Sequence, residues 1–428
     1  MARQLQPSDV FTPNRFPLEE HNVYAARTKA EADLGSAIGR NQVPVVYGEY
    51  GVGKTTLVKK YFHEEEAAGR FVHVLNPANK NIDDVAKVVL EAIGYRVEVS
   101  RETSTGSAVE GSVEAGVFAA LKAKLSGELT ESESRREELL VTSPTDQGFL
   151  KVLADAEITI AIDEMHKSSD GFRLQLADLI KAASNQGLPY PRIVVLGTTA
   201  DAEELVRQDE GVDRLVREVR VEPMIDDESR FVVTEGMQRL GLGISGSDTE
   251  TIIRTAAGAP ALLQEICLDV AEHAVKAGRD HITRDDIGAS VRAFLLNSQA
   301  RLTQRYMTVI ETVGPRRYRK QILRAMAESA NDFVTMDELT QTISKNLRED
   351  VPATALSGPL RELKKLEYGE ILRDVSRPSS DGTRVYNLTA FKDPRMKAFI
   401  RAMHAVEAQG MLPTGDEVAG LSSADDSY

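Results

Sequence analysis

Residues 48–55 read Gly48-Glu49-Tyr50-Gly51-Val52-Gly53-Lys54-Thr55, and Thr56 follows them. The stretch fits the pattern G-x-x-x-x-G-K-[ST] at every position. Glycines let backbone N–H groups wrap a phosphate, and a helix that starts directly after the turn points its positive N-terminus at the same anion. The lysine neutralises the terminal phosphates, and the threonine hydroxyl is a Mg²⁺ ligand. Residues 48–56 are therefore predicted to form a phosphate loop that binds a nucleoside triphosphate with Mg²⁺.

A second signature is an apolar strand that ends in two carboxylates. Residues 158–162 are apolar and β-rich, and Asp163 and Glu164 follow them. We expect Asp163 to orient Mg²⁺ through its waters and Glu164 to polarise the attacking water as a general base. The alternative is an acidic strand end that caps the next helix. Behind a complete phosphate loop, the pair indicates hydrolysis rather than binding alone, and the chain is interpreted as an ATPase.

The composition sets the limits of this interpretation. A chain of 428 residues suggests two or three domains, and a net charge of −14 excludes a polyanion-binding molecule as a whole. The single cysteine, Cys267, is typical of a reducing compartment. We see neither an apolar run of membrane-spanning length nor a signal peptide, so we expect a cytoplasmic protein without membrane contact.

The order of predicted elements defines the fold class. Strands are expected at residues 44–47, 71–75, 158–162, 193–196 and 219–221, with helices between them, one of them capped by Asn81. From residue 227 to 298 the pattern is helical, with breaks at residues 241–246, 258–260 and 276–281. This alternation predicts an α/β fold with a parallel sheet, followed by an all-α lid.

An insertion interrupts the α/β pattern at residues 96–142. From residue 113 to 129 every odd position is small or apolar, which favours a β-hairpin. Val117, Leu121, Leu125 and Leu129 also recur at a spacing of four, as on a helix. We favour the hairpin, and both a surface role and a functional role stay open.

The C-terminal region has the element order of a winged helix. Helices are expected at residues 320–329, 336–343 and 354–366, and two β segments at 370–375 and 383–388. Residues 301–408 carry 19 Lys+Arg and 14 Asp+Glu, a net charge of +5, against −19 for the rest. We expect four cations to contact double-stranded DNA, three on the third helix and one in the wing: Arg361, Lys364, Lys365 and Arg377. The alternative is a module that docks a protein partner.

The predicted fold is thus a P-loop parallel sheet with an all-α lid and a C-terminal winged-helix domain. The domains are expected at residues 1–225, 226–298 and 299–408, and residues 409–428 are expected to form a disordered tail.

The phosphate loop and the Asp163-Glu164 strand resemble those of the AAA+ ATPases, especially the replication-initiator type. The resemblance implies ATP as the nucleotide, a homo-oligomer with ATP between protomers, and a sensor residue at Thr198 or Thr199. A simple helix cap is the alternative for these threonines. It also implies an arginine that reaches a neighbour's phosphate, with Arg214 preferred over Arg217. A surface ion pair is the alternative for these arginines.

The predicted lid departs from the initiator type. In the replication-initiator type an arginine is often found at this place, which Gly258-Ala259-Pro260 occupies here. This Gly-x-Pro motif is similar to that of the STAND signalling ATPases. The resemblance implies that Pro260 packs near the nucleotide base. The alternative is that the glycine ends one helix and the proline opens the next. Asn22-Val23-Tyr24 is either an adenine contact or part of the core.

Two functions remain open. One is an ATP-hydrolysing oligomer that acts on or with DNA, in replication, transposition or defence. The other is a signalling switch in which slow turnover gates assembly, and the winged helix and the insertion bind proteins.

Overall fold

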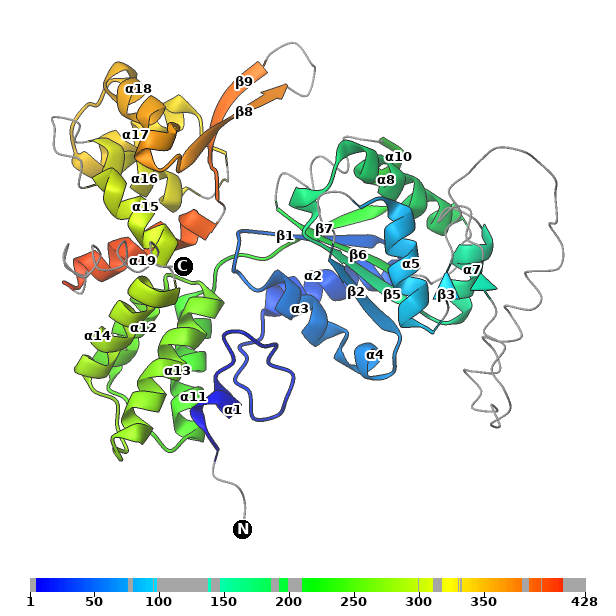
Figure 1. Ribbon diagram of the computed structural model, residues 1–428, viewed down its shortest axis with the longest axis horizontal. Helices are drawn as coiled ribbons and strands as arrows, with labels where there is room; N and C mark the ends of the chain where they lie inside the picture. The colour runs from blue at the N-terminus through cyan, green and yellow to red at the C-terminus, as the bar shows by residue number, and fades with distance from the viewer. Residues whose placement is uncertain are drawn as a thin grey trace, which may run out of the picture. The chain divides into compact units, whose positions relative to one another are not determined.

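A computed structural model describes residues 5–75, 80–94, 96–97, 138–139, 147–185, 192–198, 210–298, 300–310, 318–329, 331, 333–378, 385–393 and 395–410. The chain forms two compact units (Figure 1). The first, here called the sheet unit, comprises Arg27–Gly48 and Lys54–Val221. The second, the helical unit, comprises Met1–Ala26, Glu49–Gly53 and Glu222–Tyr428.

The sheet unit is built on parallel strands in the order β2-β5-β6-β1-β7. The strands are β1 (Val43–Tyr47), β2 (Phe71–Leu75), β5 (Thr159–Asp163), β6 (Arg192–Gly197) and β7 (Val216–Arg220). The three inner strands are buried along almost their whole length, as is usual for parallel strands with helices on both faces. The predicted strands are confirmed, although the last one, β7, begins and ends earlier than residues 219–221. β6 pairs with β5.

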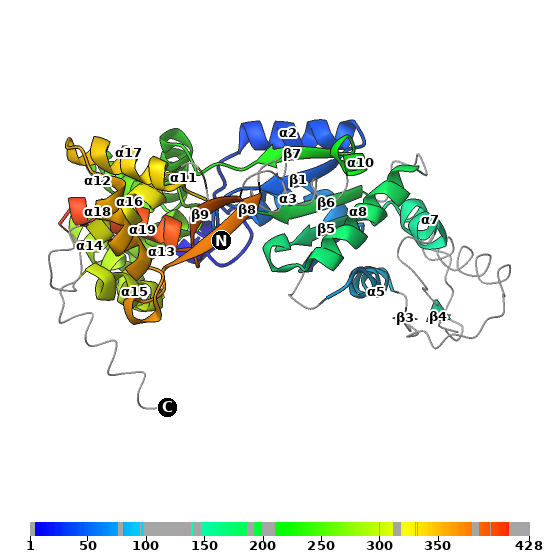
Figure 2. The same cartoon turned by 90° about the horizontal axis from the view of Figure 1, so that it is seen from above.

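Helices cover both faces of this sheet. They are α2 (Thr28–Gly39), α3 (Lys54–Tyr61), α4 (His63–Ala67), α5 (Ile82–Ala92), α7 (Gln147–Asp155), α8 (Asp170–Asn185) and α10 (Glu210–Asp213). Figure 2 shows α2 on one side of the sheet and α5 on the other. Asn81 caps α5 as predicted, because its Oδ1 accepts from the Asp84 N–H at 2.9 Å. The predicted α/β fold with a parallel sheet is confirmed.

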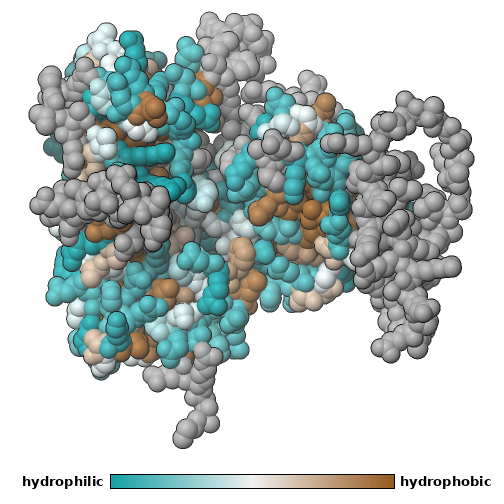
Figure 3. All heavy atoms as spheres, in the orientation of Figure 1, coloured by the Kyte–Doolittle hydropathy of each residue, from teal (hydrophilic) through white to brown (hydrophobic). Residues whose placement is uncertain are grey.

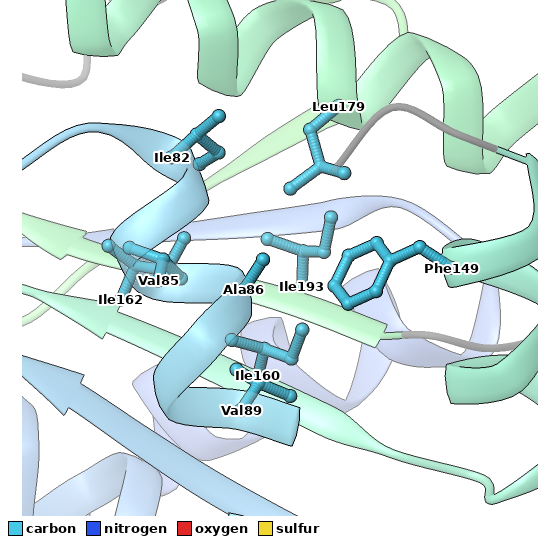
Figure 4. A pocket seen from close by; sticks show the side chains of 9 residues that line it. All are labelled: Ile82, Val85, Ala86, Val89, Phe149, Ile160, Ile162, Leu179 and Ile193. Atoms are coloured by element: carbon cyan, nitrogen blue, oxygen red, sulfur yellow. The ribbon is translucent and has the colours of Figure 1, made fainter. Parts of the chain in front are cut away.

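The core of the sheet unit contains an apolar hollow, which Figure 4 shows from close by. Side chains from α5, α7, α8, β5 and β6 converge on it, among them Val85, Phe149, Leu179 and Ile160. Every side chain that lines it is a hydrocarbon, so the hollow offers a nucleotide no side-chain hydrogen bond. It belongs to the packing of the core.

The ends of the predicted insertion are described, and its middle is not. β3 (Arg96–Val97) pairs in parallel with β4 (Glu138–Leu139). The predicted hairpin at residues 113–129 lies outside the described residues.

The helical unit begins with a lead-in that packs on helices far along the chain. Its first elements are α1 (Pro7–Val10), α11 (Asp226–Arg239), α12 (Gly246–Ala256), α13 (Pro260–Lys276), α14 (Arg284–Ala293) and the π-helical turn η2 (Phe294–Ser298). The three predicted helix breaks are confirmed. Phe11 is fully buried against α11, and a Cβ on Gly236 would lie 2.4 Å from its ring. The lead-in therefore shares the core of these helices.

The remaining elements follow the predicted order of three helices and a hairpin. They are α15 (Ala300–Ile310), α16 (Tyr318–Glu328), α17 (Met336–Leu347), α18 (Ala353–Glu362), the 3-10 turn η3 (Leu366–Tyr368), β8 (Leu372–Pro378), β9 (Val385–Phe391) and α19 (Arg395–Ala408). β8 and β9 are antiparallel. The predicted domain boundaries stay predictions.

One predicted helix is too long. The third helix was expected to reach residue 366, whereas α18 ends at Glu362. Lys365 is extended, with φ −96° and ψ 148°, and the Leu363 carbonyl O accepts a hydrogen bond from the Leu372 N–H at 3.0 Å. The chain leaves the helix to enter the hairpin. The prediction that the third helix carries Lys364 and Lys365 is therefore wrong.

Among the described residues, no helix combines the length and apolar character needed to cross a membrane. Figure 3 shows one face of the molecule, on which polar side chains predominate.

Candidate functional site

The phosphate loop leaves the carboxyl end of β1 and enters α3 at Lys54. Gly51 and Gly53 have φ angles of 82° and 94°, a conformation that residues with a Cβ rarely adopt. The Lys54 Nζ folds back and donates a hydrogen bond to the Gly48 carbonyl O at 3.0 Å. Residues 48–53 thus form the turn between a strand and a helix, as the phosphate-loop pattern predicted.

Other residues of the loop differ in exposure and partners. Val52 is buried, whereas Tyr50 is half exposed. Glu49, which groups with the helical unit, lies 2.9 Å from the Lys397 Nζ and also pairs with Arg401 of α19. Both cations lie about 350 residues from Glu49 along the chain, so no local pattern indicated the contact.

Thr55 and Asp163 come together as predicted for a pair of Mg²⁺ ligands. The Thr55 Oγ1 donates to the Asp163 Oδ2 at 2.7 Å, and the Glu164 N–H donates to Oδ1 at 2.7 Å. Burial raises the pKa of Asp163, but hydrogen bonds from His73, Thr55 and the Glu164 N–H outweigh it and leave the pKa below its usual value. Asp163 is therefore ionised at neutral pH. A hydroxyl and a carboxylate are the hard oxygen ligands that Mg²⁺ requires.

His73 is a member of the site that sequence reasoning missed. It lies in β2, next to the strand that carries Asp163, and its Nε2 is 3.1 Å from the Asp163 Oδ2. The available signal was a single polar residue in the apolar strand at residues 71–75. Its partner depends on which strands are neighbours, and the sequence pattern alone does not show that.

Glu164 follows β5 in a left-handed conformation, with φ 61° and ψ 40°. This conformation is uncommon for a residue with a side chain and is often found at functional sites. The 3-10 turn η1 (Met165–Lys167) comes next. The Lys167 Nζ lies 2.5 Å from the Glu164 Oε2, so the predicted general base is ion-paired here. The Arg173 Nη2 donates to the Met165 carbonyl O at 3.4 Å.

Thr198 follows β6, which lies between β1 and β5. Gly197 is in register with Tyr47, the last residue before the phosphate loop. Thr198 is half-buried at the same edge of the sheet as the loop and Asp163. Thr199, the other predicted sensor residue, lies outside the described residues.

Arg214 and Arg217 lie at the other edge of the sheet. Arg214 follows α10, Arg217 lies in β7, and both are exposed. Arg217 is in register with Pro44, about 10 Å along β1 from Tyr47 at 3.3 Å per residue. The sheet therefore does not bring either arginine to the phosphate loop of its own chain.

Pro260 lies close to the phosphate loop. A Cβ on Gly53 would lie 3.8 Å from the Pro260 Cγ, and both residues belong to the helical unit. Pro260 is the first residue of α13, so the helix-opening alternative holds as well. Gly258 has φ 76°, and a Cβ there would lie 2.8 Å from the Met224 carbonyl O. Both the positive φ angle and the short distance to the Met224 carbonyl O require a glycine at position 258.

The segment Asn22-Val23-Tyr24 is held by the lid helices. Val23 is fully buried, as the core-packing alternative predicted. The Gln264 side chain of α13 donates to the Val23 carbonyl O at 3.1 Å and accepts from the Thr12 N–H at 3.0 Å. An adenine contact by Tyr24 stays a prediction.

Two of the predicted DNA-contacting cations form ion pairs within the chain. Lys364 pairs with Asp374 at 2.5 Å, and Lys365 pairs with Glu367 at 3.6 Å. Arg361 is exposed in the last turn of α18, without an ion-pair partner among the described residues. The Arg377 side chain lies outside the described residues.

Arg319, in the first turn of α16, is a cation whose burial the sequence pattern did not indicate. It is only 5% exposed. Its Nη2 lies 2.6 Å from the Glu362 Oε2, and its guanidinium stacks 4.3 Å from the centre of the Tyr368 ring. This arginine fills the core and is not available to a phosphate.

A family model for the novel STAND NTPase 1 proteins matches residues 14–278, more than half of the chain. The chain belongs to this family. The match confirms the predicted resemblance to STAND-type P-loop ATPases, and it spans the phosphate loop, Asp163, Glu164 and Pro260 of this STAND NTPase.

No curated protein sequence matches this STAND NTPase. Its structure is similar to that of Cdc6p from Pyrobaculum aerophilum, at 14% identity and a TM-score of 0.44, over 94% of this chain and 98% of that chain. A Walker-type ATPase of Pyrococcus abyssi has 15% identity and a TM-score of 0.46, over 91% and 98%. The ORC1 protein of Aeropyrum pernix, in complex with DNA, has 15% identity and a TM-score of 0.42, over 95% and 100%. Likenesses at this level carry no argument about function.

Proposed function

We propose that this protein is a Mg²⁺-dependent ATPase and that ATP turnover makes it a nucleotide-controlled switch. The main support is the hydrogen bond between Thr55 and Asp163, directly beside a complete phosphate loop. A loop that only cradled phosphate would not require an ionised carboxylate at this point. The proposal is that the pair holds Mg²⁺, which would supply charge neutralisation at the phosphates.

The residues of this chain would divide the chemistry among them. Lys54 would exchange the Gly48 carbonyl O for a phosphate oxygen, since an ammonium gains more from an anion than from a neutral acceptor. Glu164 would accept the proton of the attacking water, and for this its carboxylate has to leave Lys167. Thr198 or Thr199 would hold that water. The ion pair between Glu164 and Lys167 supports slow turnover in the absence of a trigger.

The first test is ATP hydrolysis by the full chain with Mg²⁺. Lys54→Ala is expected to lower kcat/KM by at least about 100-fold, the scale for removing one preorganised donor of transition-state charge. Lys29→Ala is the matched control, because Lys29 is an exposed lysine of α2. Equal rates for the two variants would show that the phosphate loop does not serve hydrolysis.

We also propose that the active form is a homo-oligomer in which Arg214, or else Arg217, reaches a neighbour's nucleotide. Both arginines are exposed at the sheet edge opposite their own phosphate loop, which supports a role in trans. Arg214→Ala and Lys54→Ala are each expected to be inactive alone and to regain activity when mixed. Mixtures that stay inactive, with no ATP-dependent change of mass in light scattering, would contradict this proposal.

The C-terminal elements support a winged helix at residues 299–408, behind an all-α lid at residues 226–298. We propose that it binds double-stranded DNA through Arg361, whose guanidinium is exposed, together with Arg377. A second candidate is a protein-docking surface, which would cover Leu366, a leucine that is 83% exposed. The rate of ATP hydrolysis with and without duplex DNA at low salt separates the two. Stimulation supports DNA binding, and an unchanged rate favours a protein partner.

A further inference from the structure

His73 occupies a fixed place beside the candidate Mg²⁺ site. In the parallel pair of β2 and β5, His73 is in register with Ala161 and Leu75 with Asp163. Side chains two residues apart along a strand lie on the same face of the sheet, so His73 and Asp163 are diagonal neighbours on one face. Their side chains are 16% and 10% exposed, so little water competes for the contact.

The direction of the hydrogen bond follows from the chemistry of the two groups. An ionised carboxylate only accepts hydrogen bonds, so the Nε2 of His73 donates to the Asp163 Oδ2 at 3.1 Å. The same oxygen accepts from the Thr55 Oγ1, and the Glu164 N–H donates to the other oxygen. These three donors fix both the position and the rotation of the carboxylate.

The three donors differ in what carries them. Thr55 starts the helix after the phosphate loop, and Glu164 starts the turn that holds the general base. His73 lies inside β2, which pairs in parallel with β5, the strand that carries Asp163. Of the three donors, it is therefore the one that comes from the neighbouring strand.

We propose that His73 is a positioning residue that aims the Asp163 carboxylate at the Mg²⁺ bound with ATP. The proposal rests on the proposed ATPase function. Hydrogen-bond partners of metal ligands orient them, and their loss typically costs about 10- to 100-fold in metal affinity or activity. His73 touches neither nucleotide nor metal in this scheme, and it acts through Asp163.

The test compares two amides that differ by one methylene. The Nε2 of Gln lies about as far from the backbone as the Nε2 of His, whereas the Nδ2 of Asn falls short of it. His73→Gln is therefore expected to keep the hydrogen bond to Asp163, and His73→Asn to lose it. His63→Asn is the control, because His63 is an exposed histidine of α4. Thermal unfolding confirms that each variant is folded.

The first readout is the binding of a non-hydrolysable ATP analogue as Mg²⁺ is titrated. His73→Asn is expected to raise the half-saturating Mg²⁺ concentration about 10-fold, whereas His73→Gln stays close to wild type. Binding of the same analogue in EDTA is expected to be unchanged in both, since Lys54 and the loop bind the phosphates. The second readout is hydrolysis at saturating ATP and Mg²⁺, where we expect kcat to fall in His73→Asn and KM to stay constant.

Two results would overturn the proposal. One is a folded His73→Asn variant with the Mg²⁺ dependence of wild type. The other is an equal loss in the Asn and Gln variants, which would indicate a requirement for the imidazole itself. If the wild-type protein binds the analogue with Mg²⁺ but hydrolyses no ATP, the ATPase proposal fails. The binding titration still decides the role of His73 in that case.

Discussion

The edge of the sheet at the phosphate loop and the C-terminal hairpin region contrast in how their polar residues are arranged. At the sheet edge, residues far apart in sequence converge, because Thr55 and His73 both bind Asp163. Near the hairpin, two of the predicted cations pair with acids close to them in sequence, Lys364 with Asp374 and Lys365 with Glu367. A spacing motif ties side chains to a backbone shape, whereas a count of charges does not say which of them stay available.

The largest effect is expected at the sheet edge, where Glu164→Gln removes the candidate general base. Turnover is expected to fall about 1,000-fold, within the usual range for general-base catalysis, while ATP binding is retained. Single-turnover hydrolysis and filter binding measure the two quantities separately. Glu64→Gln, at an exposed position of α4, is the control. A variant that hydrolyses ATP at the wild-type rate would remove Glu164 from the mechanism and weaken the contrast.

The next effect concerns stability in the C-terminal region. Arg319→Met would remove the arginine that forms an ion pair with the buried Glu362, and breaking a buried pair typically costs about 3–5 kcal/mol of folding free energy. Arg324→Met is the matched control, because its ion pair with Glu328 is exposed and contributes little. Urea denaturation measures both. Equal midpoints would mean that the pair between Arg319 and Glu362 does not stabilise the core.

The smallest expected effect concerns DNA binding by two cations of the C-terminal region, Arg361 and Lys364. If DNA is bound, Arg361→Ala is expected to lower the slope of log K against log salt by about 1, the value for one phosphate contact. Lys364→Ala is expected to leave the slope unchanged, because Asp374 holds its ammonium. Fluorescence anisotropy with labelled duplex at several salt concentrations gives both slopes. A larger change in Lys364→Ala would reverse the assignment.

Much of the fold was predictable, because local signals were strong. The strands of the sheet unit are short apolar runs bounded by turns, and Asn81 marks the start of α5 by its side-chain hydrogen bond. The phosphate loop fixes its own conformation through Gly51 and Gly53. In each case the residues that decide the structure lie close together in sequence.

The failures involve partners from elsewhere in the chain. The helical pattern continued past Glu362, but the hydrogen bond between Leu363 and Leu372 draws the chain into the hairpin. The burial of Arg319 depends on Glu362 and Tyr368, which lie more than 40 residues away along the chain. His73 showed no ligand spacing, because its partner belongs to the neighbouring strand. Strand order and long-range packing supply this information, and no local window contains it.

The packing of the lead-in has a consequence for folding during synthesis on the ribosome. Phe11 packs against α11, and the Thr12 N–H donates a hydrogen bond to the side chain of Gln264, which is 252 residues further along the chain. At about 5–20 residues per second, translation leaves Phe11 and Thr12 without these partners for tens of seconds. The sheet unit, in contrast, is complete once Val221 has emerged. During that interval Val10 and Phe11, which are fully buried in the folded protein, lack the helices that cover them.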